Sequence, residues 1–315
     1  MLPLPLPLDA PIKLKVKHFL TFTLMHGLVG PSNPLLPASE ITLMYFASHL
    51  ANTVSYETVK LYLVAVQDLH RELNFPLKLN DIHRLQKVLT GIKRRTPTKR
   101  LDRFPITLTV LHSIHSYLKP ELSYNLDHVM LWAAFTLAFF GFLRSSEFTC
   151  NGPFDPSVHL TSKDITLVPN THSPSHMLVH IKQSKTDPFR QGHTITIAKS
   201  SSPICSVMAM KDYLLQVQPP SSHPLFAFVQ PRQWLTRNNL TTELRLILHQ
   251  CGLPANNFYS HSFRIGAATT AAKAGLPPWL IKVLGRWSSD CYERYIRTPK
   301  CTILEVPRLL ANTSP

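Results

Sequence analysis

Residues 260–297 bring together side chains that suit chemistry on a phosphodiester. The segment reads SHSFRIGAATTAAKAGLPPWLIKVLGRWSSDCYERYIR, in which His261 and Arg264 precede Trp287 and Tyr295. His261 and Arg264 are three residues apart, so on a helix they share one face and can point at one anion. The rest of the chain must supply further cationic groups and the elements that hold them.

Arg144 and Lys185 are the upstream candidates for these cationic groups. Arg144 follows a long apolar run, and Lys185 lies in the polar sequence KQSKTDPFRQGH between two stretches with strand character. Taken singly, each has an ordinary structural explanation, since Arg144 and Glu147 have the spacing of a helical ion pair and a turn lysine is usually solvated. The same holds for one histidine among 16 and for a tryptophan in a core-forming segment. The combination is what points to a site.

The chain is strongly basic. Its 315 residues carry 33 Lys and Arg against 18 Asp and Glu, a formal net charge of +15. Such a surface attracts polyanions, of which nucleic acid is the commonest, although charge alone does not separate DNA from RNA or acidic lipid. The length is sufficient for two domains that each bury a core.

The cysteines indicate neither a disulfide framework nor a zinc site. They are odd in number, widely spaced and without a C-x-x-C pair, namely Cys150, Cys205, Cys251, Cys291 and Cys301. We interpret them as reduced thiols of an intracellular protein. No membrane span is expected, because the longest apolar run, residues 129–143, is shorter than the roughly 20 residues that cross a bilayer. This run is interpreted as a buried helix.

Residues 12–92 predict four helices and no strand. Apolar residues recur at three- and four-residue spacing, as in ITLMYFASHL. Ser39, Ser55 and Asn80 stand where N-caps are expected. This part is therefore predicted to be a compact all-α N-terminal domain. Residues 1–11, which alternate Leu with Pro, are expected to be an extended leader and not a signal peptide.

Residues 93–103, KRRTPTKRLDR, are dense in positive charge and contain a proline, which is typical of a linker. One interpretation is a solvated connector. Given the overall charge we favour a basic strap along a phosphate backbone, and a nuclear localisation signal is compatible with either. The residues expected to contact the phosphates are Lys93, Arg94, Arg95, Lys99, Arg100 and Arg103.

Residues 104–300 predict a second, α+β domain, and residues 301–315 a C-terminal tail. Two helices and then three strands are expected, at residues 107–118, 125–143, 164–168, 177–181 and 194–197. The strands form a small antiparallel sheet, with Lys185 near the tip of its last hairpin. Helical signals resume at Pro203, with Ser202 as the cap.

These candidates, in this order and local context, resemble the tyrosine recombinase (phage integrase) family over nearly the whole chain. FGFLRSSEF resembles the family's first arginine motif and places Arg144. The hairpin with SKTD resembles the segment that presents the catalytic lysine, here Lys185. HSFRIGAAT resembles the H-x-x-R box, with His261 and Arg264.

LGRWSSDCYERYIR resembles the stretch from the family's second His or Trp, here Trp287, to its tyrosine nucleophile. Trp287 is expected to pack against the site and to donate one hydrogen bond from its indole N–H. Tyr292 and Tyr295 are both candidates for the nucleophile. The family's tyrosine is commonly followed by a residue and then a basic or His position, which Tyr295 in YIR matches better, so Tyr295 is expected. The GRW variant, LTGIKRR and PIT look most like the recombinases of eukaryotic DIRS-like retrotransposons and Cryptons.

The resemblance implies that DNA is cleaved and rejoined through a 3′-phosphotyrosyl intermediate on Tyr295, with no metal or other cofactor. Arg144 and Arg264 are expected to clamp the phosphate, since a guanidinium stays charged and bonds bidentately. Lys185 is expected to be the general acid for the leaving 5′ oxygen. His261 is expected to assist proton transfer from the tyrosine hydroxyl, whose free pKa is about 10.

The resemblance also implies a fold and partners. We expect a mainly α protein with a small antiparallel β-sheet, in which an all-α core-binding domain and an α+β catalytic domain close around double-stranded DNA. A tetramer on two DNA sites, with the tail on a neighbouring subunit, and a nuclear location are further expectations. Three alternatives stay open: a type IB topoisomerase, an inactive domesticated DNA-binding protein, and a purely structural nucleic-acid binder.

Overall fold

The protein falls into two compact units, residues 1–100 and 101–315, which are described separately as the N-terminal unit and the C-terminal unit. The structure is a computed structural model that describes residues 10–30, 34–95, 103–118, 125–185, 187–229, 232–297 and 307. The predicted leader and tail lie almost entirely outside these residues. The boundaries expected at residues 92, 103 and 300 stay predictions. The fold class, mainly α with small antiparallel sheets, is confirmed.

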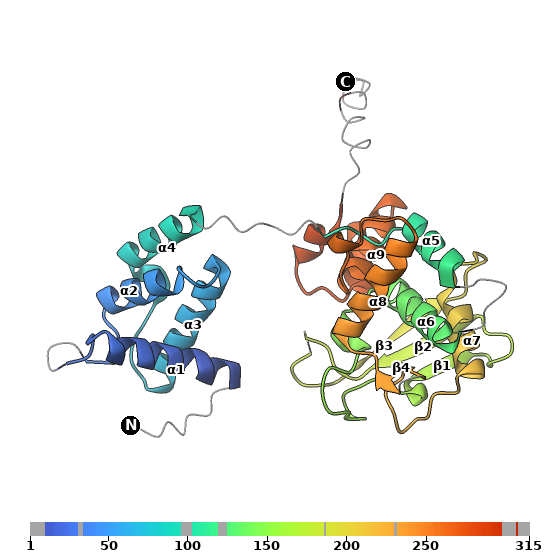
Figure 1. The fold of residues 1–315 in the computed structure, drawn as a ribbon, viewed down its shortest axis with the longest axis horizontal. Helices are drawn as coiled ribbons and strands as arrows, with labels where there is room; N and C mark the ends of the chain where they lie inside the picture. The colour runs from blue at the N-terminus through green and yellow to red at the C-terminus, as the bar shows by residue number, and fades with distance from the viewer. Residues whose placement is uncertain are drawn as a thin grey trace. The chain divides into compact units, whose positions relative to one another are not determined.

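The N-terminal unit is helical throughout its described part, as predicted. Its elements are α1 (Ala10–Met25), α2 (Glu40–Leu50), α3 (Tyr56–Glu72), the short 3-10 helix η1 (Leu79–Asp81) and α4 (His83–Arg95) (Figure 1). Helix α1 packs against α3, and α2 against α4. The core between them is built around buried side chains such as Phe19, Phe46 and Leu63.

Two of the three predicted N-caps are confirmed. The side chains of Ser39 and Ser55 accept hydrogen bonds from the backbone N–H groups of Thr42 and Thr58. The N-cap predicted at Asn80 is wrong, because Asn80 lies inside η1 and α4 starts only after that turn.

Helix α4 continues into the segment predicted to be a linker. Its buried apolar positions Leu89 and Ile92 extend the packed face almost to the end, so Lys93, Arg94 and Arg95 form the last helical turn. Basic side chains are favoured there by the partial negative charge at a helix C-terminus. The first three residues of the predicted basic linker, residues 93–95, are therefore helical.

The C-terminal unit is arranged around α6 (Leu126–Phe140), which is buried on nearly all sides and packs against α5, α7 and α9 (Figure 1). The other helices are α5 (Leu108–Leu118), η2 (Ser145–Glu147), η3 (Ser162–Asp164), α7 (Ser206–Gln216), α8 (Arg237–Gln250), η4 (Ala255–Asn257), α9 (Ser262–Lys273), α10 (Pro278–Leu284) and η5 (Asp290–Tyr295). A buried core helix was predicted from the apolar run, and this prediction is confirmed.

The three predicted strands form one antiparallel sheet in the order β1-β2-β3. They are β1 (Ile165–Val168), β2 (His176–Ile181) and β3 (His193–Ala198). Val179 pairs with Ile165 on one side and with Ile195 on the other. A second pair, β4 (Ala227–Phe228) with β5 (Gln233–Trp234), was not predicted, because two-residue strands leave no periodic signal.

Two helix boundaries differ from prediction. Helix α6 ends at Phe140 because Gly141 caps it and Phe142 takes a left-handed backbone conformation (φ 50°), so the expected extension to residue 143 is wrong. Helix α7 starts at Ser206, after Cys205, and not at Pro203. The hydroxyl of Ser202 instead accepts a hydrogen bond from the backbone of Ile204 in a local turn.

Candidate active site

The segment that carries the predicted site folds back on itself. His261 is the N-cap residue of α9, and Arg264 lies in the first turn of that helix. Helix α9 packs against both α10 and η5, which bring Trp287 and Tyr295 back towards its start. Four of the six predicted catalytic side chains are thus collected by three consecutive helices.

The hydroxyl of Tyr295 and Nε2 of His261 lie 3.0 Å apart, and the centroids of the two rings are 5.2 Å apart. In the neutral tautomer with its proton on Nδ1, Nε2 accepts the hydrogen bond from the hydroxyl. This contact joins a hydroxyl to a group that can accept its proton, which is the arrangement that activates a hydroxyl for covalent chemistry.

The charge state of His261 favours this role. Burial is the main cause that lowers the pKa of His261 to about 4, and repulsion of the imidazolium by the nearby Arg264, Arg103, Arg144 and Arg237 contributes to the same shift. The imidazole is therefore neutral at physiological pH, and only the neutral form can accept a proton.

The two tyrosines of η5 have different surroundings. Tyr292 is buried, with its ring facing Trp287 at a centroid distance of 6.0 Å. Tyr295 also packs on the indole, at 5.2 Å, but directs its hydroxyl to His261. The geometry therefore supports Tyr295 over Tyr292 as the nucleophile.

Arg264 is fully buried in the wall of the site. Its two terminal nitrogens donate to the backbone oxygens of Phe142 and Gly285, and its guanidinium carbon lies 4.2 Å from the centre of the Trp287 ring. Burial lowers the pKa of Arg264, and Arg144 lowers it further by repulsion. Both terminal nitrogens of Arg264, which were expected to bind a phosphate bidentately, thus already donate to backbone oxygens.

Trp287 lies directly on the backbone of Gly285. A Cβ atom at Gly285 would approach Cζ3 of the indole to 1.6 Å, so this position admits no side chain while the ring stays in place. The indole also meets the ring of Phe142 edge to face. The glycine of the GRW sequence therefore lets the indole pack between Arg264 and the tyrosines.

Arg144 reaches the site from η2. Its Nη1 donates to Oε1 of Glu147 at 3.0 Å and to the hydroxyl of Ser184 at 3.1 Å. The Glu147 carboxylate is buried and also accepts from Nη2 of Arg286 at 2.8 Å. Sequence reasoning missed Arg286, although it stands between Gly285 and Trp287, because its partner is 139 residues away.

Lys185 is exposed in the turn between β2 and β3. Its chain neighbour Ser184 contacts Arg144, so the turn that carries Lys185 is anchored beside the first arginine. The distance that matters for proton transfer depends on a bound DNA strand, and the assignment of Lys185 stays a prediction.

Several donors of the cluster lack acceptors. Among the residues that the structure describes, the buried atoms without a hydrogen-bond partner include Nε of Arg264, Nε of Arg286 and Nε1 of Trp287. All three are N–H donors, and buried donors normally find an acceptor. For the donors of Arg264 and Trp287, an oxyanion such as a phosphodiester has the chemistry of the missing acceptor.

The basic residues predicted to contact DNA are only partly described. Lys93, Arg94 and Arg95 are exposed on α4, whereas Lys99 and Arg100 lie outside the described residues. Arg103 is exposed, with its guanidinium 5.5 Å from the centre of the Tyr259 ring.

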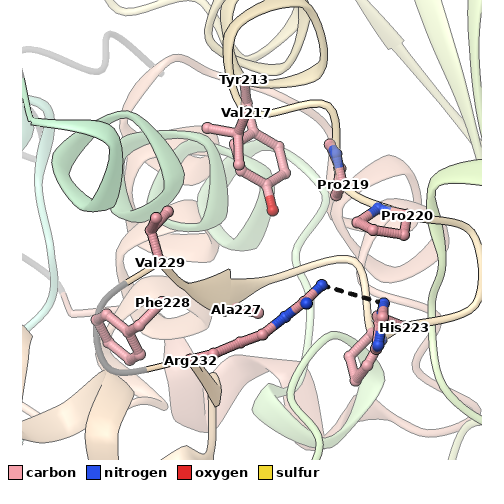
Figure 2. Close-up of a pocket in the computed structure, with 10 residues that line it drawn as sticks. Tyr213, Val217, Pro219, Pro220, His223, Ala227, Phe228, Val229 and Arg232 are labelled. Carbon is pink, nitrogen blue, oxygen red and sulfur yellow. Dashed lines mark hydrogen bonds between the residues drawn. The ribbon is translucent and has the colours of Figure 1, made fainter.

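Two hollows of the C-terminal unit are lined by none of the six predicted catalytic residues. One, of about 230 Å³, is shown in Figure 2, where Arg232 extends to His223 and donates to its ring at 3.3 Å. The other, of about 390 Å³, includes Asp127, His128 and Glu243. The candidate site is thus assembled at buried contacts rather than in either hollow.

In the described ranges, His, Cys, Asp and Glu side chains nowhere gather in a group of three or more that could hold a metal ion. No helix in that part of the chain has the length and apolar character needed to cross a membrane. Cys150, Cys205, Cys251 and Cys291 are free thiols, and Cys301 lies outside the described residues.

Comparison of the sequence with models of protein families gives no match. One curated relative, an integrase/recombinase XerD homolog of Selenomonas ruminantium, is 26% identical over 271 residues, which cover 83% of this chain and 74% of that protein.

Solved structures share the fold at low sequence identity. The XerH site-specific recombinase bound to palindromic difH substrate superposes with a TM-score of 0.64 at 16% identity, covering 96% of this chain and 78% of that one. The Tn1549 transposon integrase in complex with transposon right end DNA superposes with a TM-score of 0.61 at 14% identity, covering 96% of this chain and 95% of that one. A lambda integrase dimer bound to a COC′ core site superposes with a TM-score of 0.51 at 14% identity, covering 92% of this chain and 72% of that one.

Proposed function

We propose that this protein is a tyrosine recombinase/integrase, the family of proteins that it resembles in fold and sequence, and that it cuts and rejoins DNA through a covalent phosphotyrosyl intermediate. The observation that carries the proposal is the 3.0 Å contact between the Tyr295 hydroxyl and Nε2 of His261. Arg264 lies beside this pair, with its guanidinium carbon 5.8 Å from the centre of the tyrosine ring.

In the cleavage step, the oxygen of Tyr295 attacks phosphorus while its proton passes to Nε2 of His261. The bond between phosphorus and the 5′ oxygen breaks, and Lys185 protonates that oxygen. The products are a 3′-phosphotyrosyl link and a free 5′-hydroxyl. Attack by a 5′-hydroxyl on this link reverses the step and rejoins the strand. The link retains the free energy of the broken diester, so the chemistry requires no nucleotide or metal.

Arg144 and Arg264 supply the positive charge for the non-bridging oxygens. Loss of either is expected to raise the barrier by about 3 kcal/mol or more, by analogy with removal of an oxyanion donor. Arg144 is the more accessible of the two, with 15% of its side chain exposed, whereas Arg264 is enclosed. We therefore assign direct phosphate binding chiefly to Arg144, with Arg264 contributing its charge and its Nε–H.

Double-stranded DNA is the proposed partner. The formal charge of +15 and the exposed basic turn at the end of α4 support it. Closure of the two units around the duplex, a tetramer during strand exchange and a nuclear location belong to the same proposal. The GRW, LTGIKRR and PIT segments support integration of a eukaryotic DIRS-like or Crypton element as the biological role.

A suicide DNA substrate tests the chemistry, since a nick beside the cleavage point lets the 5′ product diffuse away and traps the protein on the 3′ end. The target sequence is first selected from random duplexes that the protein binds. The wild-type protein is expected to form an adduct that survives denaturing electrophoresis. Tyr295→Phe is expected to abolish it and Tyr292→Phe, the matched control, to retain it. An adduct with Tyr295→Phe overturns the assignment.

The same assay separates the alternatives. A domesticated DNA-binding protein would bind the selected duplex and form no adduct. A type IB topoisomerase would relax supercoiled plasmid without joining strands of two duplexes. The expected result is an adduct together with joining between two substrates.

A further inference from the structure

Glu147 lies between two arginines at the edge of the site. Its Oε1 accepts from Nη1 of Arg144 at 3.0 Å, and its Oε2 accepts from the Arg144 backbone N–H at 2.9 Å and from Nη2 of Arg286 at 2.8 Å. The carboxylate side chain is 0% exposed, and that of Arg286 is 11% exposed. A carboxylate this deeply buried depends on its donors, so removal of one of them affects the others.

Two arginines that share one carboxylate leave one positive charge in excess. An isolated pair of Arg144 and Glu147 would orient the guanidinium but also offset the charge that a phosphate meets. The guanidinium of Arg286 offsets the carboxylate instead. Glu147 can then fix the direction of Arg144 while the cluster stays cationic.

Arg286 also holds the backbone that leads to Arg144. Its Nη1 donates to the oxygen of Gly141 at 3.1 Å, and Arg264 donates to the oxygen of the next residue, Phe142. Arg286 and Arg264 therefore both donate hydrogen bonds to the turn at residues 141–142. Arg286 has a left-handed backbone (φ 53°), directly before Trp287.

We propose that Arg286 is a positioning residue for the reaction under "Proposed function", on which this inference rests. Through Glu147 and the turn at residues 141–142, it keeps Arg144 aligned with the scissile phosphate and keeps the cluster cationic. Arg286 acts through Arg144 and does not touch the substrate.

A neutral substrate distinguishes this role from a merely structural one. Adduct formation is measured in single turnover at saturating DNA, with an ordinary phosphodiester and with a methylphosphonate, which lacks the non-bridging charge. Arg286→Met is expected to slow the reaction of the diester by about 10- to 100-fold, as for loss of an electrostatic contribution. On the methylphosphonate the loss is expected to shrink to about threefold or less, as for Arg144→Met, since little charge then has to be stabilised.

Two further variants complete the design. Arg286→Lys keeps one donor for Glu147 but not the planar fork, so an intermediate, substrate-dependent loss is expected. If Arg286→Met does not fold, Arg286→Lys takes its place in the comparison of the two substrates. Arg245→Met is the matched control, because Arg245 likewise donates to backbone oxygens, those of Phe258 and Asn256, and is expected to react with both substrates at the wild-type rate.

The outcomes are distinct. Equal losses on the two substrates for the folded Arg286 variants overturn the positioning role and leave the proposed function intact. A wild-type protein that forms no adduct with the diester overturns the proposed function and this inference with it.

Discussion

The guanidinium carbon of Arg264 lies 4.2 Å from the centre of the Trp287 indole, inside a site that buries both side chains. A cation over an indole face is worth up to about 2 kcal/mol when desolvated. The pair joins α9 to the turn after α10, so the tryptophan stabilises the charge on which phosphate chemistry would depend. Its N–H, on the ring edge, has no acceptor among the described residues.

Trp287→Phe is therefore expected to slow adduct formation by about tenfold or more, because it removes this donor. Its free energy of unfolding is expected to change by less than about 1.5 kcal/mol, since most of the packing is kept. Trp287→Ala is expected to lower it by about 3 to 5 kcal/mol. Denaturant unfolding and the suicide substrate measure the two effects. Trp279→Phe, at a position 65% exposed, is the control. A Trp287→Phe protein with wild-type rate would remove the N–H from the mechanism.

The lowered pKa of His261 predicts a dependence of stability on pH. The folded value is about 4, against about 6.5 in the unfolded chain, so the unfolded state binds more protons between these values. The free energy of unfolding is expected to fall by roughly 2 to 3 kcal/mol on this account as the pH drops from about 6.5 to about 4. Urea unfolding at several pH values, compared with His261→Asn, measures it. The dependence of the free energy of unfolding on pH should be weaker in the variant by this amount. Identical pH dependences in the two proteins would contradict the lowered pKa of His261.

Lys185 is expected to matter only while the leaving oxygen needs a proton. Lys185→Ala should slow adduct formation by about 10²- to 10⁴-fold, the usual contribution of a general acid. A substrate with sulfur in place of the 5′ bridging oxygen should restore most of the rate, because a thiolate leaves without protonation. Lys163→Ala, at another exposed position of the same unit, is the control. Loss of rate on both substrates would indicate a role in binding or folding instead.

The basic turn of α4 is expected to bind phosphates without reading sequence. Replacing Lys93, Arg94 and Arg95 together by alanine should weaken binding to specific and random duplexes alike. The slope of log affinity against log salt should shrink by about 0.9 for each phosphate that the variant no longer neutralises. Titrations at several salt concentrations measure it, with Lys13→Ala/Lys17→Ala on α1 as the control. An unchanged slope would place the DNA elsewhere.

Local signals predicted the elements well. Alternation gave β2 and β3 to within a residue or two, and Ser39 and Ser55 cap helices because a cap depends on the next few residues. Asn80 has the same chemistry, but the turn η1 intervenes, and that turn depends on packing.

The site was harder to predict in detail. The order of the motifs identified six candidate residues, yet the burial of Arg264 and the contact of Arg286 with Glu147 are set by segments more than a hundred residues apart. The prediction that α6 extends to residue 143 is wrong for a related reason. The turn at Phe142 that follows the helix is held by a hydrogen bond from Arg264, which lies on the distant helix α9.

Gly266 allows α9 to lie directly against the backbone near the start of the C-terminal unit. A Cβ there would lie 1.8 Å from the oxygen of Ile106, so α9 and the chain entering the C-terminal unit are in direct backbone contact. The N–H of Ile106 also donates to the oxygen of Ser262, the residue after His261. The backbone at Ile106 is therefore fixed to the first turns of α9, directly beside His261, and a side chain at Gly266 would force these two segments apart.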